Sequence, residues 1–381
     1  MQGGTRKGAG RKAKHDKKIM KNIYLSQEQI DMIKQTELDD CKNFSQKCVK
    51  LITYGIDSHM NHKIEPSSNT LDKEEKPSSN KIKFIDLFAG IGGIRKGFED
   101  TNTECVFSSE WDKYASKTYE ANYNEKPFGD ITQIKETDIP DHDILLAGFP
   151  CQPFSHIGKR EGFTHETQGT LFFDVLRILK EKRPKAFLLE NVKGLVTHDK
   201  GNTLKVIMKA LQEELGYSVF YEILDAQRFG LPQRRERIII VGFRPDLEVY
   251  DFKFPKGTDK KVPVGSILED NPTGYKISKH LQDTYLFKKD DGKPQIIDKT
   301  SEIQVNTLVA SYHKIQRLTG TFVKGGETGL RLYSELECKR LMGFPDDFKV
   351  PVSRTQMYRQ FGNSVAVPVI KAVADKIKVY L

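Results

Sequence analysis

Short apolar runs alternate with amphipathic stretches along most of the chain from residue 81 onward. The runs have the length of buried strands, and stretches such as Leu171–Lys180 and Leu204–Leu215 carry apolar residues at helical spacing. Four such runs are Phe84–Leu87, Ile144–Ala147, Ala186–Leu189 and Ile238–Val241. Strands separated by helices predict an α/β fold with a doubly wound, mostly parallel sheet over residues 81–261.

This alternation stops between residues 262 and 330. The stretch consists of short segments punctuated by glycine and rich in lysine, which predicts a second, smaller and irregular domain. Residues 331–381 are expected to return to the first domain. A helical pattern beginning near Pro368 closes the chain, with the proline close to its first turn.

The first eighty residues follow a different pattern. Residues 1–18 are basic and rich in glycine, which predicts a disordered tail, and the polar residues 58–80 predict a linker. Between them, residues 19–57 show an alternating segment followed by two helical stripes. This order resembles a ribbon-helix-helix module, in which the strands of two chains pair and enter the major groove of DNA. Under that resemblance the chain would form a homodimer, and Asn22 and Tyr24 would face the bases. The alternative is a small helical appendage with no role in DNA binding.

The distribution of charge adds a candidate partner. The 381 residues carry a formal net charge of +9, with basic excess in residues 1–22 and 251–381 and acidic excess in residues 81–150. Two separated basic regions suggest a polyanion contacted at two places, although a solvated tail and a lysine-rich surface would give the same totals.

Hydropathy and cysteine spacing exclude several classes of protein. No run of 18 apolar residues and no signal peptide are visible, so neither a membrane partner nor export is expected. The five cysteines form no CxxC pair. A disulfide framework or metal site is therefore not expected, and reduced thiols in a cytoplasm fit better.

A glycine-rich turn follows the first predicted strand, in the segment Phe84–Gly93. Its glycines are not spaced as G-x-G-x-x-G, so a nucleoside without phosphates fits this turn better than a dinucleotide. Glu110 follows twenty residues after Gly90, where a carboxylate can reach both ribose hydroxyls, and Trp111 beside it could stack on an adenine. The alternative is a tight structural turn.

Three further candidates stand at the ends of predicted strands. Cys151 lies between two prolines after the strand Ile144–Ala147, and Glu190 follows the strand Ala186–Leu189. The basic run Gln233–Arg237 precedes the strand Ile238–Val241. Taken singly, each has an ordinary explanation: a buried thiol, a helix cap or surface acid, and a solvated charge run.

Taken together and in this order, the motifs resemble those of the DNA (cytosine-5)-methyltransferases of bacterial type II restriction–modification systems. The motifs are FAGIGG, Glu110-Trp111, GDI, GFPCQPF, ENV, QRRER and QFGNSV, and the resemblance spans residues 82–381. It implies a methyltransferase sheet that binds S-adenosylmethionine, together with double-stranded DNA as the substrate. It also implies a cognate restriction endonuclease as a functional partner.

The resemblance also implies roles for individual residues. Cys151 would add to C6 of a flipped-out cytosine, while Glu190 would bind N3 and supply a proton. Arg235 and Arg237 would hold the cytosine O2 and a nearby phosphate. The positions that match the cofactor site are Phe88, Gly90, Gly92, Gly93, Glu110, Trp111, Asp130, Ile131, Pro150, Asn363 and Ser364.

Recognition of the target sequence is expected in residues 262–330. Lys314, Gln316 and Arg317 suit purine edges and phosphates, and the segment around them looks like the recognition region of enzymes acting at CCGG or CCNGG. Two alternatives remain open at this point. One is a tRNA cytosine methyltransferase on the same scaffold, and the other is a transcription regulator acting through the N-terminal module.

Overall fold

A computed structural model describes residues 81–150 and 171–381 of the chain. Its main feature is a six-stranded sheet with the order β2-β1-β3-β4-β6-β5. The strands are β1 (Ile82–Leu87), β2 (Thr103–Ser109), β3 (Ile144–Gly148), β4 (Ala186–Val192), β5 (Ser218–Asp225) and β6 (Glu236–Phe243). The first four pair in parallel and β6 runs antiparallel to both of its neighbours, which confirms the predicted mostly parallel sheet.

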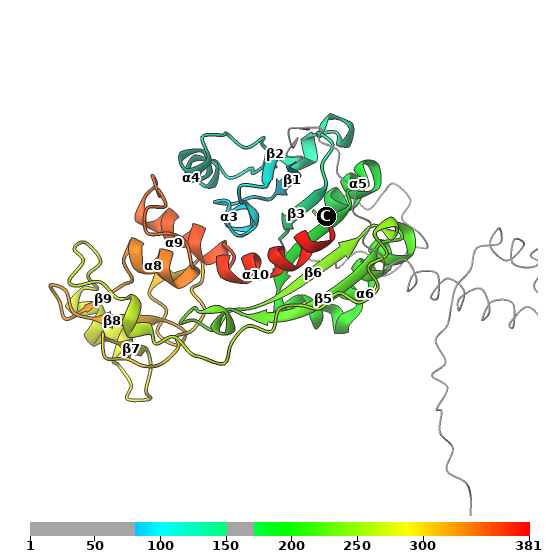
Figure 1. The fold of residues 1–381 in the computed structure, drawn as a ribbon. Coiled ribbons are helices and arrows are strands. Elements are labelled where there is room, and N and C mark those ends of the chain that lie inside the picture. The colour runs from blue at the N-terminus through cyan, green and yellow to red at the C-terminus, as the bar shows by residue number, and fades with distance from the viewer. Residues whose placement is uncertain (1–80, 151–170) are drawn as a thin grey trace, which may run out of the picture. The chain divides into compact units, whose positions relative to one another are not determined.

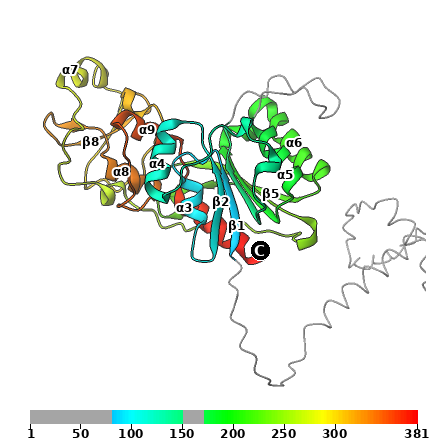
Figure 2. The same cartoon turned by 90° about the horizontal axis from the view of Figure 1, so that it is seen from above.

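Helices cover both faces of this sheet, as a doubly wound fold requires (Figures 1 and 2). One face packs against α5 (Phe172–Lys182) and α6 (Asn202–Lys209). The opposite face packs against α3 (Gly93–Phe98) and α10 (Val367–Ile377). Alternate side chains of β1 enter the two cores, with Ile85 in one and Phe84 in the other, because successive strand residues point to opposite faces.

A third core lies beside this sheet, around a small sheet with the order β7-β8-β9. Its strands are β7 (Gln295–Ile297), β8 (Thr321–Lys324) and β9 (Leu330–Arg331), and the short helix α7 (Lys279–Leu281) precedes them. The helices α8 (Glu335–Met342) and α9 (Arg354–Asn363) contribute to the same core. This core therefore extends past residue 330, where we place the end of the recognition domain. Of the α-helices that follow residue 330, α8 and α9 belong to this core and α10 packs on the large sheet.

Local signals fix several helix ends. Asp112 caps α4 (Lys113–Tyr123) by accepting from the backbone of Tyr114 and Ala115. Ser334 and Glu337 form a capping box at the start of α8. Within the described part of the chain, none of the helices has both the length and the apolar character needed to cross a membrane.

Candidate active site

The carboxyl ends of the parallel strands meet along one edge of the large sheet. Because β6 runs antiparallel to β4, the start of β6 also lies at this edge, and Arg237 pairs with Val192. A cleft of about 440 Å³ opens there, within the usual ~300–1,000 Å³ range of small-molecule sites. Predicted residues that line it are Phe88, Gly90, Gly93, Glu110, Trp111, Pro150, Glu190, Arg237, Asn363 and Ser364.

The turn after β1 has an unusual backbone. Phe88, Gly90 and Gly92 have φ values of 54°, 57° and 79°, all in the left-handed region. A non-glycine residue held there costs roughly 1–3 kcal/mol, so surrounding contacts must stabilise Phe88 in this conformation. The amide of Ala89 donates to the carbonyl of Ser109 at 2.9 Å, which ties the turn to the end of β2.

Glu110 is the main side-chain support of this turn. Its Oε2 accepts from the amide of Gly90 at 2.7 Å, and its Oε1 accepts from the amide of Asp112 at 2.7 Å. Burial raises the pKa of Glu110, and these two amides counteract the rise. A carboxylate oxygen can accept more than one hydrogen bond, so both oxygens retain capacity for a diol.

An adjoining hollow extends from Glu110 and Trp111 to the segment after residue 128. Asp130 and Ile131 lie there together with Phe88, as the motif order predicted. Trp111 is 78% exposed, so its indole is available for stacking. The described residues that line this hollow include Glu110, Asp130 and Asp174 but neither lysine nor arginine.

This charge pattern fits S-adenosylmethionine, which is a nucleoside that carries a sulfonium cation and no phosphate. When bound, this cofactor supplies an electrophilic methyl group. Gly92 was also predicted to belong to the cofactor site, but it lines neither cavity. It is the residue that precedes α3, and its backbone sets the start of that helix.

Glu190 and Arg237, which both line the cleft, form an ion pair. Nε of Arg237 lies 3.0 Å from Oε1 of Glu190. Glu190 pairs with Ile239 across the two strands, so Arg237, two residues away, points to the same face. Burial raises the pKa of Glu190, and Arg237 followed by Arg235 acts in the opposite direction.

Asn191 has a positioning contact that the sequence did not indicate. Its side chain is 3% exposed, and its Nδ2 donates to the carbonyl of Phe149 at 2.8 Å. The bond fixes the segment that leads through Pro150 to Cys151. Cys151 itself lies outside the described residues, as do Asn22 and Tyr24.

Arg235 makes its hydrogen bonds inside the protein. Its side chain is 1% exposed and donates to the carbonyls of Leu308 at 3.1 Å and Gly362 at 3.0 Å, and also to that of Ser364. A buried guanidinium must satisfy its donors, and backbone carbonyls occupy these. In the described structure Arg235 therefore joins β6, residue 308 and the end of α9, and its role with Arg237 in holding the cytosine O2 and a nearby phosphate stays a prediction.

Gln233 strengthens the same junction. It is fully buried, its Nε2 donates to the carbonyl of Leu341 at 2.5 Å, and its Oε1 accepts from the amide of Leu308 at 3.1 Å. Within the basic run before β6, Gln233 and Arg235 are therefore buried, whereas Arg234 between them is exposed.

Arg317, predicted to suit purine edges and phosphates, is also buried in the described structure. Its side chain is 4% exposed, and it donates to the carbonyls of Leu286 and Lys289, each at 2.9 Å, and to Asp291. These bonds join two loops of the irregular region, so Arg317 is an internal cross-link in the described structure, and its contact with the target stays a prediction.

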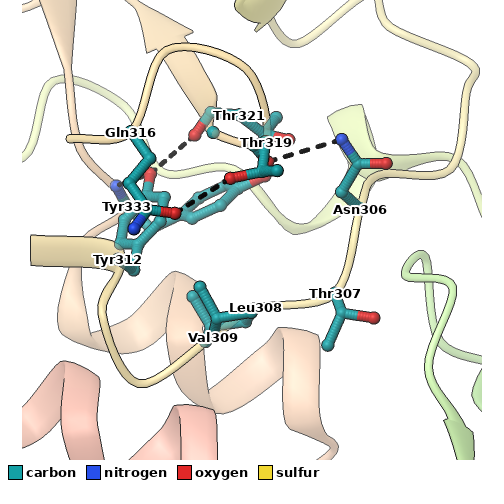
Figure 3. A pocket seen from close by; sticks show the side chains of 10 residues that line it. Asn306, Thr307, Leu308, Val309, Tyr312, Gln316, Thr319, Thr321 and Tyr333 are labelled. Atoms are coloured by element: carbon teal, nitrogen blue, oxygen red, sulfur yellow. Dashed lines mark hydrogen bonds between the residues drawn. The ribbon is translucent and has the colours of Figure 1, made fainter. Parts of the chain in front are cut away.

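Lys314 and Gln316 are exposed, as residues that contact DNA must be. Figure 3 shows Gln316 beside a small cavity. There its Oε1 accepts from Thr319 at 3.1 Å, and Asn306 donates to the carbonyl of Thr319 at 3.5 Å.

Two cleft residues on α9 were missed from the sequence. Gln356 and Arg359 line the cleft together with Gln360 and Asn363. Their spacing of three and four residues places them on one face of a helix. The helical spacing of these residues, just before and within the QFGNSV motif, was the sequence signal that could have indicated them. Arg359 contributes an exposed positive charge to the cleft.

Comparison with known proteins decides the family. The family model for C-5 cytosine-specific DNA methylase matches residues 82–379. The chain belongs to this family. The type II methyltransferase M.BsuFI of Bacillus subtilis is 64% identical over 99% of this chain and 97% of its own length. M.MspI of Moraxella sp is 57% identical over 82% of this chain and 74% of its own length.

Solved structures agree on the fold of this methylase. The Dnmt2 methyltransferase of S. pombe superimposes with a TM-score of 0.62 at 19% identity, covering 78% of this chain and 99% of its own. The Entamoeba histolytica methyltransferase EhMeth gives 0.61 at 20% identity, covering 79% and 97%. The protein is a C5-cytosine DNA methyltransferase that uses S-adenosylmethionine, which confirms the predicted enzyme and cofactor.

Proposed function

We propose that the enzyme methylates a cytosine flipped out of duplex DNA at a site of the CCGG or CCNGG kind, through a covalent bond to Cys151. The Glu190–Arg237 pair carries this proposal, because it places a carboxylate and a guanidinium in the same cleft as Glu110 and Pro150. The cytosine must leave the stack to reach such a site.

The chemistry begins with the thiolate of Cys151, which adds to C6 of the cytosine. Glu190 donates a proton to N3 as the ring takes up electrons, and C5 becomes nucleophilic towards the methyl group. After methyl transfer a base takes the proton from C5, the C6–sulfur bond breaks to release Cys151 as thiolate, and N3 returns its proton to Glu190.

The ion pair explains how Glu190 obtains that proton. In the free enzyme Arg237 opposes the effect of burial and favours the carboxylate. A cytosine whose O2 accepts from Arg237 would draw that donor away, so burial would dominate and the pKa of Glu190 would rise further. Binding of the base and protonation of the acid are then coupled.

The cofactor would be held by Phe88, Gly90, Glu110, Trp111, Asp130, Ile131, Asn363 and Ser364. Its site would be shaped by Gly92, Gly93 and Pro150. Arg235 would act as a positioning residue that keeps the recognition region in place against the start of β6. Lys314 and Gln316 would contact the target, and Arg317 would hold their loop.

Transfer of labelled methyl groups tests the reaction and its substrate together. Duplexes containing CCGG, CCNGG or neither site, and tRNA in parallel, would be incubated with the enzyme and methyl-labelled cofactor. Bisulfite sequencing would locate the modified base. Labelling confined to one cytosine of CCGG or of CCNGG supports the proposal, whereas labelling of tRNA alone would establish a tRNA cytosine methyltransferase instead.

A role in a restriction–modification system follows from the type II relatives. The methylated site would be protected from a cognate endonuclease, which would be a functional partner. Plasmid from cells that express the enzyme should resist an endonuclease specific for CCGG, and plasmid from cells with Glu190→Gln should be cut.

We also propose that residues 19–57 form a dimeric module that regulates transcription of the enzyme's own operon. Asn22 and Tyr24 would face the bases of the operator. The full chain and its Asn22→Ala and Tyr24→Ala variants would be compared for their mass in solution and for retardation of upstream DNA. A monomer that does not retard this DNA, with methylation intact, would reject the regulatory role.

A further inference from the structure

The turn after β1 is held from two sides. Glu110 accepts from Gly90 on the side of the cleft, and behind the turn the hydroxyl of Tyr123, at the end of α4, donates to the carbonyl of Gly92 at 2.7 Å. We propose that Tyr123 is a positioning residue for this turn and sets the affinity for S-adenosylmethionine without touching it. The inference rests on the proposed assignment of Gly90 and Glu110 to the cofactor site.

The ring of Tyr123 packs directly on the turn. Gly92 has a φ of 79°, and a Cβ built on it would lie 2.3 Å from the ring of Tyr123. The carbonyl of Gly92 also accepts from the amide of Lys96 at 2.8 Å, which is the first hydrogen bond of α3. One oxygen therefore joins α4, the turn and the start of α3. A side chain that fixes this oxygen fixes the path of the backbone between Gly90 and α3.

A buried arginine holds the ring of Tyr123 in place. Arg95 is 4% exposed, and its guanidinium carbon lies 4.2 Å from the centre of the ring. Its nitrogens lie 2.9 Å from Glu99 and 2.8 Å from Glu125. Because the two carboxylates fix its orientation, Arg95 forms a rigid support on the side of the ring that faces α3. The turn thus rests on a side chain that has little freedom to move.

Tyr119 provides a matched comparison. It lies one helical turn before Tyr123 on α4, and its ring centre is 4.6 Å from that of Tyr123. Its hydroxyl accepts from Nη1 of Arg95 at 2.9 Å. Both tyrosines therefore contact the same arginine, but the bond to Gly92 belongs to Tyr123. If Tyr123 served the core alone, loss of either hydroxyl would have the same consequences for the cofactor.

The experiment compares Tyr123→Phe with Tyr119→Phe in the full chain. Equilibrium dialysis with labelled S-adenosylmethionine gives the dissociation constant, and the fluorescence of Trp111, the single tryptophan of the chain, gives an independent readout from the hollow itself. The constant should rise about five- to tenfold in Tyr123→Phe, as the loss of one hydrogen bond implies, and stay within about twofold in Tyr119→Phe. At saturating cofactor, kcat and the KM for DNA should stay at wild-type values in both variants.

A second variant changes the other partner of the contact between Tyr123 and the turn, which is Gly92. Gly92→Ala places a methyl group where the ring lies and strains the backbone, so it should weaken cofactor binding more than Tyr123→Phe does. Equal constants for Tyr123→Phe and wild type, or equal losses in the two tyrosine variants, would overturn the inference. Glu110→Ala separates this result from the site assignment. If Glu110→Ala binds the cofactor as the wild type does, the proposed site is wrong. If it loses binding while Tyr123→Phe does not, the inference alone fails.

Discussion

The carboxyl edge of the large sheet and the region of residues 262–330 use charged side chains in different ways. At the sheet edge, Glu110, Glu190 and Arg237 line an open cleft. In the irregular region, Arg317 is buried and bonded to loop carbonyls. The difference follows from how much backbone hydrogen bonding each region has of its own.

In the large sheet, paired strands satisfy the backbone, so side chains at their ends can line a ligand site. In the irregular region, loop carbonyls such as those of Leu286 and Lys289 lie outside the strand ladders and accept from Arg317. Arginine offers five donors in a fixed fork and can satisfy several carbonyls at once. A conspicuous arginine in an irregular region is therefore as suited to holding loops together as to reading DNA.

Replacing Glu190 by Gln should have the largest effect. The variant keeps the shape of the side chain but loses the acid, and kcat should fall by about 10²- to 10⁴-fold while DNA affinity stays close to wild type. Single-turnover methylation gives the rate, and Glu222→Gln, on the exposed edge strand β5, is the control. A Glu190→Gln enzyme with more than a tenth of the wild-type rate would remove Glu190 from the chemistry.

Arg317→Ala tests the contrast between the two regions. Loss of a buried guanidinium leaves carbonyls of the irregular region without donors, so the free energy of unfolding should fall by about 2–3 kcal/mol. Lys314→Ala, three residues earlier and exposed, should stay within about 0.5 kcal/mol of wild type. Urea unfolding measures both. A fully stable Arg317→Ala that no longer distinguishes target from non-target DNA would show that Arg317 reads the target and does not hold the loops.

The buried carboxyl group of Asp86 predicts a dependence of stability on pH. Asp86 on β1 is fully buried, neither of its oxygens has a hydrogen-bond partner in the described structure, and burial raises its pKa from 3.8 to about 7, with Arg95 opposing. Between about pH 3.8 and 7 the folded state binds more protons than the unfolded state, so stability falls as pH rises through this window and levels off above it. Between pH 6 and 8 the loss should be about 1.4 kcal/mol, most of it below pH 7.

Asp86→Asn provides the comparison, because its amide cannot ionise. Unfolding midpoints of wild type and variant would be measured at pH 6, 7 and 8. The wild type should lose stability relative to the variant across this range. Parallel curves would show that Asp86 does not titrate there.

Lys314→Ala should have the smallest effect, confined to DNA binding. A lysine that contacts a phosphate contributes to affinity through counterion release, so its loss should reduce the slope of log K against log salt by about 1. Titrations between 50 and 200 mM salt measure this slope. An unchanged slope would place Lys314 outside the DNA interface.

Sequence patterns indicated which residues stand at the ends of strands, and therefore which residues could lie at the edge of the sheet. Glu110 and Glu190 reach the cleft because parallel strands end at one edge, and a turn of glycines marks that edge. The direction of β6 could not be inferred, since a short apolar run such as Ile238–Val241 reads the same in either direction. Its reversal brings Arg237 to the cleft.

Contacts between segments that are distant along the chain could not be predicted from the sequence. Arg235 and Arg237 look equivalent in the motif, yet one bonds carbonyls at residues 308, 362 and 364 while the other faces Glu190. The bond from Tyr123 to Gly92 spans 31 residues with no local signal. Such pairs arise from tertiary packing, which periodicity and spacing do not encode.

Trapping of the covalent intermediate tests the central claim most directly. A duplex carrying 5-fluorocytosine at the target cytosine would be incubated with the enzyme and S-adenosylmethionine, then separated under denaturing conditions. The fluorine blocks the final loss of the C5 substituent, so the wild type should form a stable adduct of protein and DNA, and Cys151→Ser should form none. An adduct that persists in Cys151→Ser, or a wild type that methylates DNA without trapping, would contradict the account.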